Sequence, residues 1–357
     1  MKMRFVISVV VLMSCLFFVD RFLAGMEHSE VVAEAQSMYA RGEQLLDAGQ
    51  AAAAIDALKR AHSLAPESHV YELAFARALL ADGQLNDAGA TLEHLLQTDS
   101  NDGAANLTMA RLQAGLGRNG EAEAYYHRAL YGTWPAGKQL TGVRLELAEF
   151  LASHAEQKQL LSELLLLQDS GGLNSGIEKT LAHLFLVAGS PARAADTYRS
   201  LIRQDPDDLV AYVGLAETQL ASGDYHAAKG NFRSALHRKP DDNQIEARLQ
   251  LATELNDLDP TPRRLSTAEK FGRSELIVEM AQSDAEQCTQ VGPAAVKIQS
   301  LMAELKEKRK SRRQVTNEAA ESLLTIAEQL WHARVECGAP AAAVNDPLPL
   351  LMRKIAQ

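Results

Sequence analysis

The stretch LLDAGQAAAAIDAL, residues 45–58, decides the fold of this chain because its pattern returns four more times. The other copies are LLADGQLNDAGATL (79–92), LQAGLGRNGEAEAYY (112–126), LFLVAGSPARAADTY (184–198) and QLASGDYHAAKGNF (219–232). Each copy carries one glycine in register, at Gly49, Gly83, Gly117, Gly189 and Gly223. The first three glycines are spaced by 34 residues and so are the last two, while the 72 residues between Gly117 and Gly189 are roughly two periods with a small insertion. A fixed period of this length indicates a repeat architecture.

The residues around each glycine predict a pair of helices. An alanine follows five residues later, at Ala54, Ala88, Ala122, Ala194 and Ala228. A large apolar residue follows four further on, at Leu58, Leu92, Tyr126, Tyr198 and Phe232. Glycine ends the first helix, alanine lets two antiparallel helices approach, and the large residue fills the space beside it. Pro66, Pro206 and Pro240 close three of the units. An ordinary helical bundle with accidental spacing does not explain five matches in register.

This pattern resembles the tetratricopeptide repeat family. The resemblance implies an array over residues 32–258, with units at 35–68, 69–102, 103–136, 175–208 and 209–242, a degenerate pair at 137–174 and a capping helix at 243–255. It also implies an all-α fold, in which stacked pairs form a right-handed α-solenoid with a concave surface lined by the first helix of each pair. A C-terminal helical extension follows the array.

Composition agrees with an all-α protein and argues against several functions. Alanine and leucine dominate the apolar residues, aromatics make up only 5% of the chain, and valine and isoleucine are sparse beyond the first twenty residues. A net charge of −10 disfavours nucleic acid as a partner. No C-x-x-C, H-E-x-x-H or G-x-S-x-G motif occurs, and the glycine-rich stretch 171–176 lacks the lysine of a phosphate loop. We therefore expect no cofactor, no metal and no enzymatic activity.

The first 26 residues predict a signal peptide or a membrane anchor. Lys2 and Arg4 precede an apolar run over residues 5–19. Three outcomes stay open: an uncleaved anchor, a cleaved signal, and a lipid on Cys15 within a loose lipobox. All three export the rest of the chain. We therefore expect a protein anchored in the inner membrane and facing the periplasm, or a periplasmic protein if the signal is cleaved.

Residues 265–357 form the C-terminal helical region. Pro260 and Pro262 mark its boundary, helices are expected at about 266–285, 294–311 and 315–336, and a short apolar segment spans 348–355. Cys288 and Cys337 each follow a helix, so an oxidising compartment favours a disulfide, worth about 4 kcal/mol; two buried thiols are the alternative. A basic run from Lys306 to Arg313 is either a solvated helix face or a surface for an acidic polymer or lipid headgroups.

The resemblance also carries groove positions onto the first helices. These are Tyr39, Glu43, Leu73, Arg77, Leu107, Arg111, Lys179, His183, Val213 and Glu217. Arg77 and Arg111 lie one repeat apart, so together they are expected to hold an acidic side chain or a carboxylate terminus. Tyr39 and Glu43 occupy the positions where some relatives begin a chaperone-tail clamp of lysine and asparagine, and this departure argues against chaperone tails. Solvated charges, and packing of Tyr39 on the next unit, are the alternatives.

The predicted function is a scaffold that binds a protein or peptide partner in its concave groove, attaches to the membrane through the N-terminal segment, and assembles an envelope-associated complex. The alternative is an accessory subunit that docks an enzyme of cell-wall or polysaccharide synthesis or export. An enzyme with its site in the C-terminal helices is a third hypothesis, which no motif supports.

Overall fold

The computed structural model describes Arg21 and residues 29–135, 140–288, 292–311, 315–337 and 346–356. Apart from Arg21, the predicted signal or anchor segment, including Cys15, lies outside the described residues. Among the helices that are described, none combines the length and the apolar character needed to cross a bilayer.

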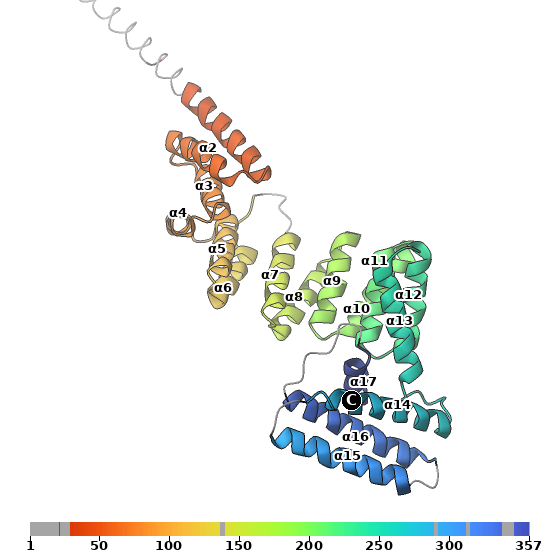
Figure 1. Cartoon of the computed structure of the whole chain (residues 1–357). Coiled ribbons are helices and arrows are strands. Elements are labelled where there is room, and N and C mark those ends of the chain that lie inside the picture. The colour runs from red at the N-terminus through yellow and green to blue at the C-terminus, as the bar shows by residue number, and fades with distance from the viewer. Residues whose placement is uncertain are drawn as a thin grey trace, which may run out of the picture. The chain divides into compact units, whose positions relative to one another are not determined.

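Two compact units divide between Leu147 and Ala148. Residues 29–47 of the first unit are helical. They are followed by α2 (Ala51–Leu64), α3 (His69–Ala81), α4 (Leu85–Thr98), α5 (Gly103–Gly115), α6 (Asn119–Tyr131) and α7 (Thr141–Ser153), within which the division falls (Figure 1).

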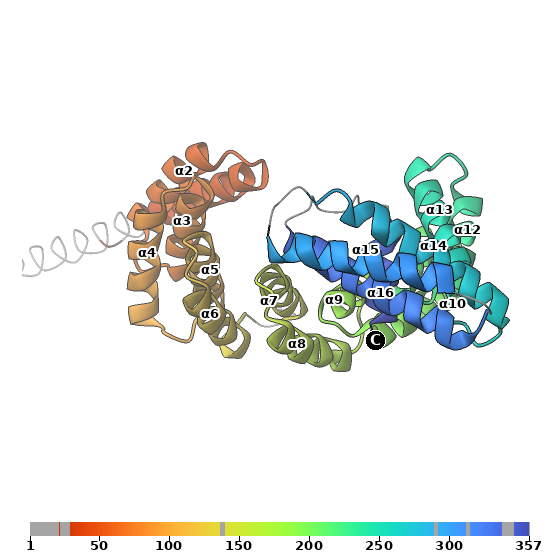
Figure 2. The same cartoon turned by 60° about the horizontal axis from the view of Figure 1, so that its bottom comes forward.

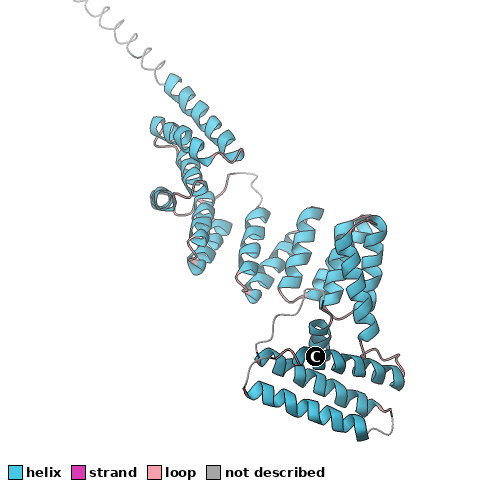
Figure 3. Ribbon diagram, in the orientation of Figure 1, coloured by secondary structure: helices cyan, strands magenta, loops and turns pink. Residues whose placement is uncertain are grey.

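The second unit contains the remaining repeat helices and the C-terminal helices. They are α8 (Gln157–Ser170), α9 (Ser175–Val187), α10 (Pro191–Gln204), α11 (Leu209–Ala221), α12 (Tyr225–Arg238), α13 (Asn243–Leu258), α14 (Thr267–Ala285), α15 (Pro293–Ser311), α16 (Asn317–Glu336) and α17 (Leu348–Ile355). Every element drawn for the described residues is a helix or a loop (Figure 3). The predicted all-α solenoid of helix pairs is therefore confirmed.

The turn glycines behave as their spacing predicts. Gly49, Gly83, Gly117, Gly189 and Gly223 have φ angles between 71° and 80°. In the first turn the Gln50 N–H donates to the Leu45 carbonyl at 2.8 Å, which satisfies a carbonyl that the ending helix leaves without a partner. A side chain would strain the backbone in this left-handed region, so glycine is the residue that the turn requires.

Ala155 occupies the corresponding turn of the degenerate pair. Its φ is 58°, the one positive value at a non-glycine residue in the described part of the chain. The Glu156 N–H donates to the Leu151 carbonyl at 3.1 Å, which is the same closing bond as in the glycine turns. Ala155 lies 34 residues before Gly189. The pair α7 and α8 therefore contains a repeat turn in register, with alanine in place of glycine.

The repeat positions pack as predicted. The five alanines that follow the turn glycines are each 0% exposed, and the five large residues that follow them are at most 5% exposed. In the degenerate pair Leu160 and Leu164 take these two places, at 1% and 0% exposure. Burying such a side chain contributes roughly 1.5–3 kcal/mol, so each repeat is held by its neighbours rather than by helix propensity alone.

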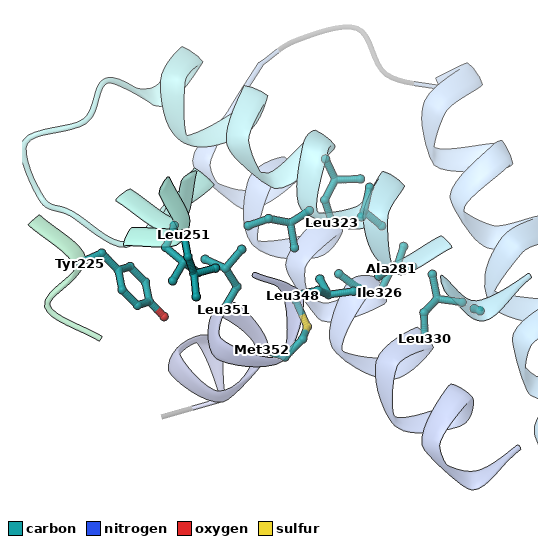
Figure 4. Packing of buried hydrophobic residues seen from close by; sticks show 14 of the residues in the cluster. Tyr225, Leu251, Ala281, Leu323, Ile326, Leu330, Leu348, Leu351 and Met352 are labelled. Carbon is teal, nitrogen blue, oxygen red and sulfur yellow. The ribbon is translucent and has the colours of Figure 1, made fainter. Parts of the chain in front are cut away.

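One apolar core joins the last repeat to the C-terminal helices. Tyr225 of α12, Leu251 of α13, Ile326 of α16 and Leu351 of α17 belong to a single buried cluster (Figure 4). The two prolines after α13 interrupt the helix without interrupting this core. Helices α14 to α17 therefore cover the end of the repeat array within the second unit.

A disulfide and an ion pair tie α14 to α16. Cys288 and Cys337 are joined by a disulfide, with Cα atoms 5.9 Å apart. One turn earlier, Arg334 Nε lies 2.9 Å from Asp284 Oδ2, and the Arg334 side chain is only 6% exposed. Desolvation raises the pKa of Asp284 above its ordinary value, against the opposing effect of Arg334. The C-terminal ends of α14 and α16 are therefore fixed together.

Candidate functional site

The expected groove positions of the first unit are engaged with one another. Tyr39 packs on Tyr71 of α3, with ring centroids 5.0 Å apart. Its pKa is raised, chiefly by burial and then by the charge of Glu43. Glu43 Oε2 lies 3.3 Å from Arg77 Nη1 of α3. Tyr39 therefore contacts the next repeat unit, which was the alternative interpretation of this residue. Glu43 and Arg77 link two successive repeats.

Arg111 of α5 is likewise paired, with a residue that the sequence analysis did not single out. Its Nε and Nη2 donate to Glu146 of α7, both at 2.7 Å. Tyr126 Oη donates to the same carboxylate at 3.0 Å. The hydrogen bond to Glu146 raises the pKa of Arg111. Arg77 and Arg111 each have a carboxylate partner in the structure. The two cations that were expected to hold an acidic group together are therefore already paired.

The next four expected groove positions lie on α3, α5 and α9. Leu73 and Leu107 are half-buried apolar residues of α3 and α5, and His183 of α9 is exposed. Lys179 Nζ lies 2.7 Å from Asp208 Oδ2, whose side chain is 6% exposed and caps the first turn of α11. Lys179 therefore links α9 to the start of α11.

Val213 and Glu217 of α11 line a real hollow. This α11–α13 hollow has a volume of about 630 Å³ and is bounded by α11, α12 and α13. Its apolar wall consists of Leu209, Val210, Val213, Phe232 and Ile245. The size falls in the range of sites that bury an organic ligand or a few peptide side chains. Two of the ten groove positions expected from the sequence thus meet at one concave site.

A charged pair closes one side of the hollow. Arg248 Nε of α13 donates to Glu217 Oε1 at 2.6 Å, and Arg248 Nη2 contacts Glu217 Oε2. This fork uses two of the five N–H donors of the guanidinium, so the others can reach a carbonyl or carboxylate in the hollow. The two side chains are 26% and 33% exposed, which keeps them accessible from the hollow.

The start of α13 also lines the hollow. Asp242 caps this helix by accepting from the backbone N–H groups of Gln244 and Ile245, at 3.0 and 3.1 Å. The hydrogen bond with Lys239, and after it these backbone bonds, lower the pKa of Asp242. The hollow therefore has an apolar wall, a capping carboxylate and a paired guanidinium.

The sequence analysis missed Arg248, Ile245 and Val210. Arg248 and Ile245 lie on the helix that was expected only to cap the array, and nothing in their spacing marks a site. Val210 is 56% exposed and is the second residue of α11, where an apolar residue is a weak signal of a site. No cluster of three or more histidine, cysteine or acidic side chains suited to a metal occurs among the residues that the structure describes.

Comparison with known proteins agrees with the repeat pattern. A family model described as "Tetratricopeptide repeat" matches residues 45–102, 79–131 and 185–251. "Cellulose synthase 1 operon protein C" of Komagataeibacter xylinus is 27% identical over 161 residues, which are 42% of this chain and 12% of that protein. The chain therefore spans about an eighth of the length of this curated relative.

Two solved structures are similar to part of this chain. One is YrrB, titled "a TPR protein with an unusual peptide-binding site", at 18% identity and a TM-score of 0.44, covering 55% of this chain and 98% of that one. The other is PilW, a "widely conserved type IV pilus biogenesis factor", at 15% identity and a TM-score of 0.47, covering 61% and 98%. Turn geometry, packing and the family match together identify the helix pairs over residues 45–131 and 185–251 as tetratricopeptide repeats.

Proposed function

We propose that this protein is an interaction scaffold whose last repeat binds an extended segment of a partner protein. The observation that carries the proposal is the α11–α13 hollow, where Val210 and Val213 leave apolar surface uncovered beside the Glu217–Arg248 pair. Apolar partner side chains enter the hollow, and the remaining Arg248 donors bind a backbone carbonyl of the same segment.

The energetics favour a short apolar anchor. Val210 is 56% exposed in the absence of a partner. Covering one exposed valine contributes on the order of 1 kcal/mol, and burying one leucine-sized partner side chain in the hollow adds roughly 2 kcal/mol. Charge-assisted hydrogen bonds from Arg248 fix the direction of the peptide. The expected affinity is moderate, as suits a scaffold that exchanges partners.

The test is affinity purification of the tagged full-length protein from gently solubilised membranes, with mass spectrometry of the bound proteins. A Val210→Asp variant places a charge in the hollow. Val70→Asp is the matched control, because Val70 is the second residue of α3 as Val210 is of α11, and it is 58% exposed outside any hollow described here. We expect a defined partner set that Val210→Asp loses and Val70→Asp keeps. Retention of the same set by Val210→Asp would overturn the assignment of the site.

The proposal also places the array outside the cytoplasm, held at the inner membrane or released into the periplasm. Lys2, Arg4 and the apolar run that follows support export, and the Cys288–Cys337 disulfide suits an oxidising compartment. A C-terminal fusion to alkaline phosphatase, which is active only after export, tests this. An active fusion that loses activity when residues 1–26 are removed is expected; an inactive full-length fusion contradicts the location.

A second candidate is an accessory subunit of a polysaccharide synthesis or export complex. The similarity to the cellulose synthase operon protein favours it, although that match involves a small part of the larger protein. In the same purification, this candidate predicts a polysaccharide synthase or export channel among the partners lost in Val210→Asp. Partners with no connection to polysaccharide would be consistent with the scaffold proposal and would rule out this second candidate.

A further inference from the structure

A second groove lies in the C-terminal helices, away from the α11–α13 hollow. Helices α14 and α15 both pack on α16 (Figure 2). Between α14 and α15 is a groove of about 780 Å³, here called the α14–α15 groove. Nothing in the function proposed above depends on it.

The groove follows α15 from Ala295 to Lys310, and the end of α14 lines it through Gln282, Ala285 and Glu286. Arg309, near the end of α15, lies 3.2 Å from Glu279 in the second half of α14. Cys288 and Ala295 line the other end. From Ala295 to Lys310 the helix rises by roughly 22 Å at 1.5 Å per residue, which is about four turns. An α15 wall of this length matches the side of one further helix.

One end of the groove is apolar. Ala285 of α14 and Ile298, Met302 and Leu305 of α15 line it. Ala285, Ile298 and Leu305 are at most 6% exposed, whereas Met302 is half-buried and presents a flexible apolar surface to the groove. Methionine adapts to varied apolar side chains, so this end suits the apolar face of a partner helix.

The other end is basic. Lys306, Arg309 and Lys310 line it, and Arg309 already pairs with Glu279 of α14. The one carboxylate among the lining residues is Glu286, which lies toward the apolar end. Lys306 is exposed, and no ion pair joins it to another described residue. Lys310 pairs only with Glu307 on its own helix at 2.9 Å, with side chains 62% and 72% exposed. Exposed pairs of this kind contribute little, so a partner carboxylate can replace Glu307 at small cost.

We propose that the α14–α15 groove binds an amphipathic helix of a partner protein whose apolar face meets Met302 and whose acidic end meets Lys306 and Lys310. Charge complementarity selects the occupant. The chain as a whole is acidic, with a net charge of −10, so only the local positive charge at this end of the groove attracts an acidic partner segment. The same net charge opposes approach to an anionic membrane, and the basic residues lie at the end of a concave groove rather than on a flat face.

Site-directed photo-crosslinking in the native host tests the proposal on the full-length protein. A benzoylphenylalanine replaces Gln299, which lines the groove and is exposed. The control position is Val296 on the same helix, 66% exposed and not among the groove residues. The charge-reversal variant is Lys306→Glu/Lys310→Glu. Its matched control is Lys297→Glu, which changes an exposed lysine of α15 outside the groove.

We expect the Gln299 probe to form an adduct whose crosslinked segment, mapped by mass spectrometry, is amphipathic and acidic at one end. The yield of the adduct falls at least tenfold in Lys306→Glu/Lys310→Glu and persists in Lys297→Glu. Both variants keep the thermal midpoint of the unchanged protein. An adduct with lipid, with a second copy of this chain or with a non-acidic segment overturns the proposal. So does an adduct equal to that at Val296, or one insensitive to charge reversal. Because Val210→Asp leaves this groove intact, failure here is separable from failure of the α11–α13 hollow.

Discussion

Lys354 adds a charged contact to the apolar packing that holds helix α17 against the last repeat, and removing its charge should loosen the helix. Lys354 Nζ donates to the Gly223 carbonyl and to Asp259 Oδ2, both at 2.6 Å. The Lys354 side chain is 24% exposed and that of Asp259 is 5% exposed. Tyr225 Oη donates to the Leu350 carbonyl at 2.9 Å beside this pair. The contact joins the repeat turn, the linker after α13 and the C-terminal helix.

The perturbation is Lys354→Met, which keeps the length of the side chain and removes the charge. Asp259 then stays buried, with Thr261 bonding only its other carboxylate oxygen, Oδ1. Breaking a buried pair by removing one partner costs about 3–5 kcal/mol, and the partial exposure of Lys354 places this case near the lower figure, about 3 kcal/mol. Asp259→Asn in the same background should recover part of the loss, with a coupling of about 2 kcal/mol.

Hydrogen exchange measured by mass spectrometry is the suitable assay, because two compact units need not unfold in one step. Lys354→Met should speed exchange in α17 and in the first turn of α12, and leave α2 to α5 unchanged. Arg353→Met is the control, since Arg353 is the exposed basic neighbour on the same helix. If Lys354→Met shifts α17 by no more than Arg353→Met does, the pair does not hold the helix and the argument from burial fails.

Three further predictions concern stability. Ala155→Gly should raise the free energy of unfolding of the second unit by about 1 kcal/mol in urea titration, because glycine relieves the positive φ; an unchanged or lower value refutes the strain. Cys288→Ser with Cys337→Ser should cost about 4 kcal/mol by the chain-entropy estimate for a separation of 49 residues, and reductant should then have no further effect on the thermal midpoint. Ser266→Ala removes the capping box of α14 and should cost about 1 kcal/mol. Hydrogen bonds from the Ser266 side chain and N–H lower the pKa of Glu269 in the folded protein. The contribution of Glu269 to stability is therefore present above its unfolded-state pKa and is lost as the pH falls through its lower folded-state pKa. A Ser266→Ala variant whose stability depends on acid pH as before contradicts this.

The fold was predictable because the decisive positions are chemically distinctive. A glycine with positive φ, an alanine at a close helix contact and a large residue beside it leave a mark in the sequence whatever the neighbours are. Ala155 escaped the glycine pattern because an alanine in the same conformation has nothing to distinguish it. Its distance of 34 residues from Gly189 was the available signal.

The site was predictable only in part because contacts between repeats depend on how far each helix is rotated. The register placed Glu43 and Arg77 on one face, and they meet across 34 residues. It did not show that Arg111 meets Glu146 across 35 residues or that Glu217 meets Arg248 across 31. A change of a few residues in spacing turns an unpaired groove charge into a partner of the next helix, so charge alone could not identify binding residues.

The C-terminal helices solve a problem that every repeat array has at its end. The outer face of the last helix pair has no further repeat to cover it, and arrays therefore need a cap. Here the face of α13 that carries Leu251 and Leu255 is 0–3% exposed because α14 to α17 extend the same core. A single polar helix would have covered that face. The additional helices instead build a second groove with a different lining, apolar at one end and basic at the other. A cap that only stabilised the array would have no need of that groove, which is the physical reason to look for a second partner there.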